Sequence, residues 1–269
     1  MDEEPKISAV VITLNEEKNI AGCLESLAWA DEIVVLDSRS TDRTVEIARK
    51  YTDKVFVEAW KGQGPHKNRS VELAQGPWIF SIDADERVTP ELAGEIRKAV
   101  NEGAYDVFAV RRKNIYRGRW VKHGGWWPDW VTRLFVKGKA RFNDVIVHDS
   151  LQTECKVGKL DNALEHYSYH SAIEFVVKSR RFIESTAILR FQKGRKISWL
   201  GVMVHTLWCF FHGYVLRGGF LDGGAGLLVA CSRALGVFYR YALLIEMNED
   251  AAKAREPAPK HDGTRSGQN

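Results

Sequence analysis

Residues 78–87 read Trp-Ile-Phe-Ser-Ile-Asp-Ala-Asp-Glu-Arg, an apolar run of strand length that ends in closely spaced carboxylates. Such a cluster repels itself unless a cation lies among the side chains, and hard oxygen ligands suit Mg²⁺ or Mn²⁺. Asp83 and Asp85 are alternate residues, so a turn after the strand lets one bind the metal and the other contact its ligand. The alternative is that the acidic residues simply precede a helix beginning near Pro90.

The chain before this stretch alternates strands with helices. Apolar runs at 7–14, 32–36 and 54–58 are separated by helical patterns at 19–27 and 44–51. Such alternation predicts an α/β fold with a parallel sheet, whose ligand site lies beyond the carboxyl ends of the strands. The polar side chains at these ends are Asn15, Asp37 and Asp83.

The first strand is not followed by a glycine-rich phosphate loop, which argues against a dinucleotide dehydrogenase, an ATPase or a sugar nucleotidyltransferase. The formal net charge of +4 over 269 residues is too small to imply a nucleic-acid partner. Residues 1–6 are short and acidic, so we expect no signal peptide and a cytoplasmic protein. The scattered cysteines are expected to be reduced thiols rather than disulfides or zinc ligands: Cys23, Cys155, Cys209 and Cys231.

Residues 10–20, 31–45 and 80–88 resemble the inverting nucleotide-sugar glycosyltransferases of the GT-A fold, of the family 2 type. Within that group the chain is most similar to the lipopolysaccharide inner-core β-glucosyltransferases, which carry Lys-Asn before the Asp-x-Asp strand and Gly-Gly-Trp-x-Pro-Asp after it. Here these segments are 67–68 and 124–129. The resemblance runs to about Met247 and implies a mostly parallel, Rossmann-like sheet. Arg39 departs from the glycine usual in the turn after Asp37, which puts that turn's geometry in doubt.

The resemblance also implies roles for individual residues. Asp37 would accept hydrogen bonds from the uracil edge, Asp83 would lie near the ribose, and Lys67 would lie near the diphosphate. Asp85 would bind a divalent metal, Mg²⁺ or Mn²⁺. The nucleotide pocket would be lined by Thr13, Asn15 and Glu16.

Residues 112–130 combine basic and aromatic side chains, which suits an anionic sugar acceptor because aromatic faces stack on sugar rings and cations meet phosphate or carboxylate groups. The alternative is a tryptophan-rich core with a solvated rim. The residues expected to bind the acceptor are Arg117, Trp126, Trp127 and Arg133, although Arg133 could instead face the diphosphate.

An acidic residue inside an aromatic segment is energetically costly unless it has a partner or a function. We therefore predict that Asp129 is the catalytic base of an inverting transfer. Asp144 and Glu86 are the second candidates for the catalytic base, and a structural role in a turn or helix cap is the alternative for each. Related GT-A enzymes complete the metal site with a late histidine, so His148 is the hypothesis for that ligand. His166 and His170 are weaker choices, since a lone histidine is more often a core hydrogen-bonder.

The C-terminal part is helical from about residue 171. Residues 197–216 lack Lys, Arg, Asp and Glu, residues 227–247 are amphipathic, and the glycine-rich segment 217–226 between them predicts a helical hairpin. Three readings stay open: a peripheral membrane contact through 197–247, an oligomer or domain interface, and a true membrane span. Residues 249–269 are expected to be a disordered tail.

The predicted domains are a GT-A catalytic domain at 1–170, divided into a nucleotide-sugar half (1–88) and an acceptor half (89–170), and a helical region at 171–248. The predicted function is metal-dependent, inverting transfer of a sugar, expected to be glucose, from a UDP-sugar to a lipopolysaccharide-core or related glycolipid. The expected location is the inner face of the cytoplasmic membrane. The alternatives are a polyprenyl-phosphate glycosyltransferase and a non-enzymatic membrane-associated sugar-binding scaffold.

Overall fold

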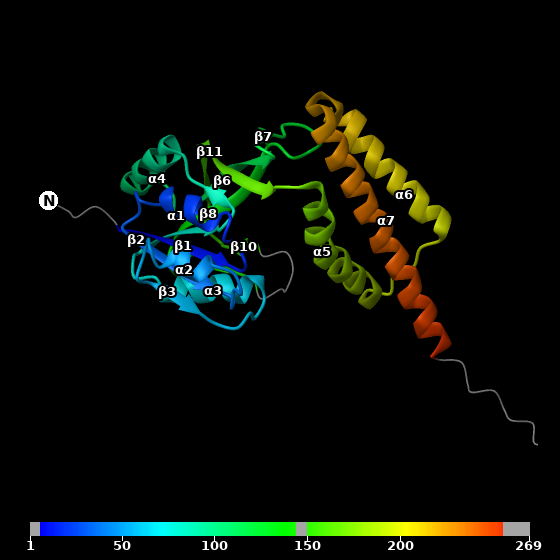
Figure 1. Cartoon of the computed structure of the whole chain (residues 1–269), viewed down its shortest axis with the longest axis horizontal. Coiled ribbons are helices and arrows are strands. Elements are labelled where there is room, and N and C mark those ends of the chain that lie inside the picture. Colours follow the sequence, from blue (N-terminus) through cyan, green and yellow to red (C-terminus); the bar gives the residue numbers. More distant parts are fainter. Residues whose placement is uncertain (1–5, 144–149, 255–269) are drawn as a thin grey trace, which may run out of the picture.

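The computed structural model describes residues 6–143 and 150–254. Figure 1 shows an α/β unit beside a unit of long helices. The strands are β1 (Ile7–Thr13), β2 (Glu32–Asp37), β3 (Val55–Val57), β4 (Trp78–Asp83), β5 (Glu86–Arg87), β6 (Val107–Tyr116), β7 (Arg119–Trp120), β8 (Asp129–Val136), β9 (Arg141–Phe142), β10 (Leu151–Gln152) and β11 (Val157–Tyr169). The helices are α1 (Ile20–Glu25), α2 (Thr44–Ala48), α3 (Gln63–Leu73), α4 (Pro90–Glu102), α5 (Ala172–Gln192), α6 (Trp199–Phe211) and α7 (Gly223–Lys253).

The main sheet has the strand order β3-β2-β1-β4-β8-β6-β11-β5, with β7 paired to β6. The strands β3, β2, β1 and β4 are parallel, as predicted, and the α/β fold class is confirmed. The sheet as a whole is mixed, because β8 runs antiparallel to both β4 and β6. The carboxyl ends of the parallel strands meet at one edge, where Ile12 is level with Asp83 and Thr13 with Asp37.

Strand β1 is buried along its whole length, so side chains cover both faces of the sheet there and the core forms on both faces. One apolar cluster packs the sheet against α1 and α4, and another packs it against α3. Fully burying a Leu or Ile side chain contributes about 1.5–3 kcal/mol, so residues such as Leu24 and Ile96 anchor these helices. The four cysteines are unpaired, as expected.

Helix α3 depends on glycine near its start. It begins at Gln63, directly after Gly62, whose φ is 111°. A Cβ atom at Gly64 would lie 1.7 Å from the backbone oxygen of Asn143. Glycine therefore stands at this position to allow close backbone approach and does not mark a loop.

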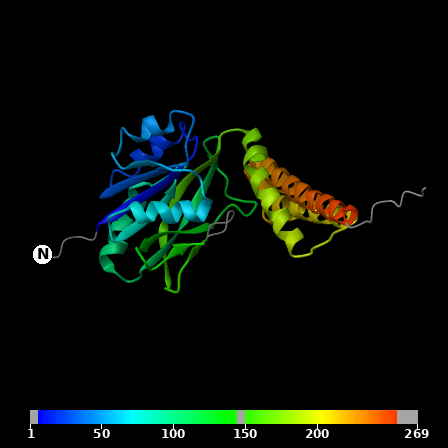
Figure 2. The same cartoon turned by 90° about the horizontal axis from the view of Figure 1, so that it is seen from below.

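The C-terminal helices form the predicted hairpin and add α5 beside it, as the two views in Figures 1 and 2 show. Helix α6 continues as a π-helical turn (His212–Leu216), and a 3₁₀ turn (Gly219–Asp222) leads into α7. The glycines of this reversal permit close packing, since a Cβ atom at Gly226 would lie 1.8 Å from the oxygen of Gly219. Helix α7 continues to Lys253, beyond the predicted end at Met247, because Glu249 to Ala252 favour helix despite their polarity.

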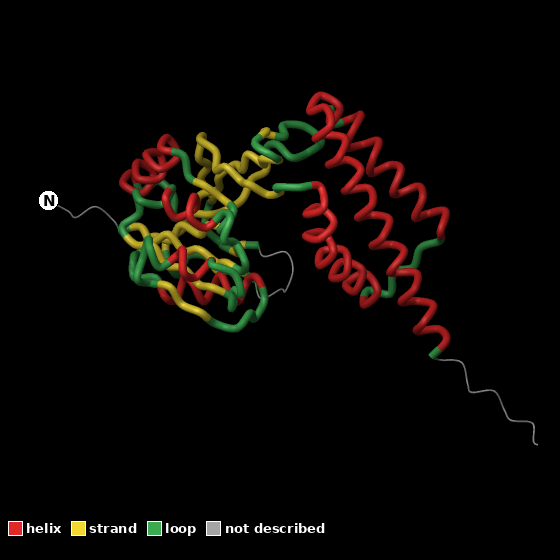
Figure 3. The backbone as a smooth tube through the Cα atoms, viewed as in Figure 1, coloured by secondary structure: helices red, strands yellow, loops and turns green. Residues whose placement is uncertain are grey.

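The hairpin tip is attached to the loop between β7 and β8, seen at the top of the tube in Figure 3. The backbone N–H of Gly124 donates to the oxygen of Arg217 at 3.0 Å, and Arg233 donates to the oxygen of Gly124 at 2.7 Å. The carboxylate of Asp222 accepts from the backbone N–H of His123 at 2.7 Å. These bonds hold the helical unit against the sheet.

Candidate active site

A pocket of about 610 Å³ lies beyond the carboxyl ends of β1, β2 and β4. We call it the strand-end pocket. Its lining includes Thr13 and Glu16 from the end of β1, Asp85 from the turn after β4, and Lys178 from α5. The Oγ1 atom of Thr13 is buried and has no hydrogen-bond partner among the described residues. A buried unpaired hydroxyl is costly, so this atom indicates a polar ligand in the pocket.

Asp37 and Asn15 hold the turn that closes one side of this pocket. The carboxylate of Asp37 accepts from the backbone N–H of Ser40 at 2.7 Å, and Oδ1 of Asn15 accepts from the N–H of Thr41 at 2.8 Å. Arg39 adopts φ 65°, the left-handed conformation that favours glycine. A residue other than glycine in this conformation costs about 1–2 kcal/mol.

Asp83 is neutralised by two buried cations. Its carboxylate lies 2.9 Å from Nζ of Lys67 and 2.6 Å from Nη2 of Arg133. Burial opposes ionisation, but the charges of Arg133 and Lys67 prevail and hold the pKa of Asp83 well below its usual range. Lys67 is only 2% exposed, so it lies beneath this carboxylate.

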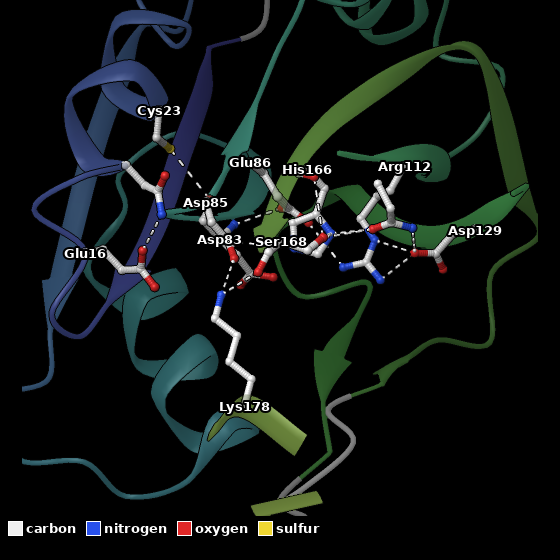
Figure 4. A network of polar contacts seen from close by, with 12 residues as sticks. Glu16, Cys23, Asp83, Asp85, Glu86, Arg112, Asp129, His166, Ser168 and Lys178 are labelled. Atoms are coloured by element: carbon white, nitrogen blue, oxygen red, sulfur yellow. Dashed lines mark hydrogen bonds and ion pairs between the residues drawn. The ribbon is translucent and has the colours of Figure 1, made fainter. Parts of the chain in front are cut away.

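Asp85 faces the pocket with a different set of neighbours, shown in Figure 4. Its carboxylate lies 3.4 Å from Nε2 of His166 and 3.4 Å from Nζ of Lys178. Burial raises the pKa of Asp85, but the charge and hydrogen bond of His166, with Lys178, lower it to about 2. Both carboxylates are therefore ionised, but the contacts of Asp85 are longer than those of Asp83, which leaves room for another partner at Asp85.

His166 is oriented by its second nitrogen. Nδ1 lies 2.7 Å from Oδ1 of Asn114 and 2.9 Å from Oγ of Ser168, which turns Nε2 toward Asp85. Metal-binding histidines in proteins are commonly fixed in this way by a hydrogen bond at the other ring nitrogen.

The residues present fit a divalent cation that completes its coordination with ligand and water oxygens. Within 6–143 and 150–254, no group of three or more His, Cys, Asp or Glu side chains is arranged around one point. Mg²⁺ is usually held by one or two protein groups plus substrate phosphates, so Asp85 with His166 is a sufficient protein contribution. The pKa of Glu16 is raised by burial and by the charge of Asp85, and a cation would relieve that repulsion.

Asp129 lies at the start of β8 and belongs to the same polar network. Its Oδ2 atom accepts from Arg112 at 2.8 Å and from Nδ2 of Asn114 at 3.2 Å, and Asn114 in turn contacts His166. Within the described chain all of its hydrogen bonds reach Oδ2, and the side chain is 30% exposed. Among the described residues, Oδ1 receives no hydrogen bond.

The reserve candidates are placed differently. Glu86 is fully buried, where it accepts from the backbone N–H of Asp83 at 2.9 Å and pairs with Arg133 and Arg112, so it has a structural role. Asp144 and His148 lie outside the described residues. Nε2 of His170 lies 3.0 Å from Oδ1 of Asn19, away from Asp85.

The four residues expected to bind the acceptor are not brought together. Trp126 packs against Tyr169 and Phe175 in an aromatic cluster, and Arg133 is buried beside Asp83. Arg117 lies in the exposed turn between β6 and β7 with φ 47°. The ring centroids of Trp127 and Trp120 are 5.0 Å apart, and the guanidinium of Arg111 lies over the Trp127 ring. Trp126 is thus explained by packing, which was the alternative for residues 112–130, whereas Arg133 forms ion pairs with Asp83 and Glu86.

Lys178 and Arg112 were missed by sequence reasoning. Lys178 lies in an ordinary helical pattern, and only the fold brings α5 to the pocket edge. Arg112 could have been found, because an arginine in a strand opposite Asp129 is a charge pair across antiparallel strands.

The comparisons with known proteins agree with this geometry. The profile of the family described as Glycosyl transferase family 2 matches residues 8–154. The chain belongs to this family. It is therefore a glycosyltransferase, and the polar network at the ends of β1, β2 and β4 is the candidate active site of a glycosyltransferase.

Relatives of this glycosyltransferase match nearly its whole length. An uncharacterised glycosyltransferase of Rickettsia felis is 30% identical, over 96% of this chain and 95% of that protein. The lipopolysaccharide core biosynthesis glycosyltransferase LpsC of Rhizobium meliloti is 28% identical, over 91% of this chain and 97% of that protein. The crystal structure of Staphylococcus aureus TarS residues 1–349 in complex with UDP-GlcNAc has a TM-score of 0.49 and 17% identity, covering 91% of this chain and 92% of that one.

Membership of the family confirms the resemblance to family 2 glycosyltransferases stated from the sequence. It also excludes the non-enzymatic scaffold as the main function.

Proposed function

We propose that this protein is an inverting, metal-dependent glycosyltransferase that moves glucose from UDP-glucose to a lipopolysaccharide-core or related glycolipid acceptor. The observation that carries the proposal is the unequal environment of two neighbouring carboxylates. Asp83 is neutralised by Lys67 and Arg133, whereas Asp85 faces the pocket beside His166 and Lys178. The name of the LpsC relative supports the acceptor class.

Asp85 and His166 would hold the metal, which when bound supplies positive charge to the diphosphate leaving group. Lys178 is the cation best placed to meet the diphosphate, since Lys67 is buried under Asp83. Thr13 would hydrogen-bond the nucleotide through its unpaired hydroxyl. Asp37 would accept a hydrogen bond from the uracil, as the family resemblance implies. His148 stays a prediction outside the described residues.

The transfer would be a single displacement. The acceptor hydroxyl oxygen forms a bond to the anomeric carbon, the bond from that carbon to the diphosphate oxygen breaks, and UDP leaves. Asp129 takes the hydroxyl proton through Oδ1, while Arg112 and Asn114 hold Oδ2. Attack from the face opposite the leaving group inverts the anomeric configuration.

The test is calorimetric titration of the protein with UDP, UDP-glucose, and ADP- and GDP-linked sugars, each with and without Mn²⁺. We expect binding of the uridine ligands only, dependent on Mn²⁺ and lost in Asp85→Asn. The matched control is Asp53→Asn, which changes an exposed carboxylate far from the pocket lining and should bind as wild type. Failure of any nucleotide to bind under these conditions would refute the proposal.

The same function requires access to a lipid-anchored acceptor, and we propose that α6 provides it by lying on the membrane. Two helical segments, Trp199–Leu216 and Gly219–Lys253, are long and apolar enough to cross a membrane by length and composition. The first is hardly buried, and its exposed apolar residues recur every three or four positions: Leu200, Val204, Leu207, Phe211 and Val215. One continuous apolar face with basic residues at both ends suits the interface of an anionic bilayer.

A further inference from the structure

A second cavity lies outside the active site, as a groove of about 550 Å³ between α5 and α7. The two helices lie side by side and share apolar clusters near both ends of α5, where Phe175 meets Val229 and Phe191 meets Leu244. They therefore run in the same direction, and the groove follows them. Its lining is mainly apolar, with side chains such as Val177, Leu235 and Tyr239.

The groove opens next to the strand-end pocket. Val177 lines both cavities, and its neighbour Lys178 reaches the carboxylate of Asp85. Val177 is 66% exposed and lies one residue before Lys178. A molecule with a polar end in the pocket and an apolar end in the groove would cover this side chain.

The groove extends along both helices. On α7 its lining runs from Ser232 to Glu246, which corresponds to roughly 20 Å of helix. The charged residues are at the rim, where Arg180 pairs with Glu184 at 2.7 Å and both remain solvent-accessible. The shape and polarity suit one extended hydrocarbon chain.

Gly236 keeps part of this groove open. It lies in the middle of α7, where glycine costs about 1 kcal/mol relative to alanine. A Cβ atom there would meet nothing within 4 Å, so close helix packing does not require the glycine. The position therefore faces open space, and a large side chain there would occupy part of the groove.

We propose that the groove between α5 and α7 binds the hydrocarbon chain of the lipid-linked acceptor, whose sugar end then lies at the strand-end pocket. The inference rests on the proposed function and adds to it a site for the lipid part of the substrate. A bilayer would contact the exposed face of α6 rather than a groove on the other side of α7. A second copy of the chain would not account for the position of the groove beside the pocket, where Val177 lines both cavities.

The test uses palmitic acid with a terminal diazirine as the probe, added to the full-length protein and crosslinked by light. Mass spectrometry then identifies the labelled peptides. We expect labelling on the groove residues of α5 and α7, reduced by about tenfold in Gly236→Trp because the indole fills the space. The control is Gly224→Trp, the same change on the same helix at an exposed glycine whose Cβ also meets nothing within 4 Å. It should label as wild type.

Mn²⁺-dependent binding of UDP is measured on each variant to show that the fold and the donor site are intact. Label confined to α6, or label unaffected by Gly236→Trp, would overturn the proposal in favour of adsorption to the exposed apolar face. A Gly236→Trp protein that changes oligomeric state without any groove label would overturn it in favour of a second copy. Groove labelling in a protein that binds no UDP would support the hydrocarbon-binding site and refute the proposed binding of a UDP-sugar donor.

Discussion

Asp83 and Asp85 are two residues apart and yet have different electrostatic partners. Asp83 lies against the buried cations Lys67 and Arg133, while Asp85 meets His166 and Lys178 at the pocket surface. Both carboxylates line the strand-end pocket, so they differ in their partners: short ion pairs satisfy Asp83, and the 3.4 Å contacts of Asp85 leave room for a ligand. This difference is the basis of the metal-binding role that we propose for Asp85.

Asp129→Asn should lower kcat by roughly 10²–10⁴-fold, because an amide cannot take the proton of the acceptor hydroxyl. Binding of UDP with Mn²⁺ should be unchanged, since Asp129 does not line the strand-end pocket. Initial rates of UDP release with a lipopolysaccharide-core acceptor would measure the effect. Near-normal turnover would reject Asp129 as the base and favour a phosphate acceptor, such as polyprenyl phosphate, which needs no base.

Lys67→Met should lower the free energy of unfolding by about 3 kcal/mol, because it leaves the buried carboxylate of Asp83 with Arg133 as its main partner. Urea unfolding followed by circular dichroism would measure the loss. Lys98→Met is the control, since Lys98 forms only an exposed pair with Glu102 and should have little effect. Equal midpoints for the two variants would contradict a structural role for Lys67.

At the scale of elements, prediction succeeded where local signals and periodicity agree. Helix α4 begins after Thr89, whose side chain accepts a hydrogen bond from the backbone N–H of Leu92. The helix has Pro90 in its first turn and ends at Gly103, which adopts the left-handed conformation. Strand β11 was not predicted. The alternation of apolar and charged residues in its first half is a strand signal that sequence reasoning missed, whereas its partners are distant in the sequence and leave no local signal. Its register shift beyond Lys159 has no sequence signal either.

The same contrast holds for the active site. Thr13, Asp37 and Asp83 end buried parallel strands, so topology alone places them together. His166 and Lys178 come from β11 and α5, and their approach to Asp85 depends on how those elements pack. Sequence reasoning therefore found the residues on the parallel strands and missed most of those supplied from the other side of the pocket.

Helix α6 should bind vesicles of phosphatidylethanolamine and phosphatidylglycerol through its apolar face. The double change Leu200→Glu and Leu207→Glu removes two side chains that are 75% and 63% exposed, and should weaken vesicle binding by at least about tenfold. Co-sedimentation would measure the binding. Val157→Glu, on an exposed strand position of the α/β unit, is the control. Equal binding by both variants would contradict the membrane role of α6.

At the scale of the whole molecule, the active site lies between two units with different surfaces. The α/β unit supplies the strand-end pocket, and α5 both closes the pocket with Lys178 and forms the groove with α7. Helix α6 packs on α7 and turns its apolar residues outward. A lipid-linked acceptor could therefore leave the bilayer near α6, lie along α7 and reach the site.

The most direct test of the central claim is pulsed electron paramagnetic resonance of Mn²⁺ bound to the protein with UDP. We predict phosphorus couplings from the diphosphate together with a nitrogen coupling from His166, the latter lost in His166→Gln. A spectrum of Mn²⁺ with phosphorus couplings but no imidazole nitrogen would remove His166 from the metal site. No protein-bound Mn²⁺ in the presence of UDP would contradict the metal-dependent mechanism altogether.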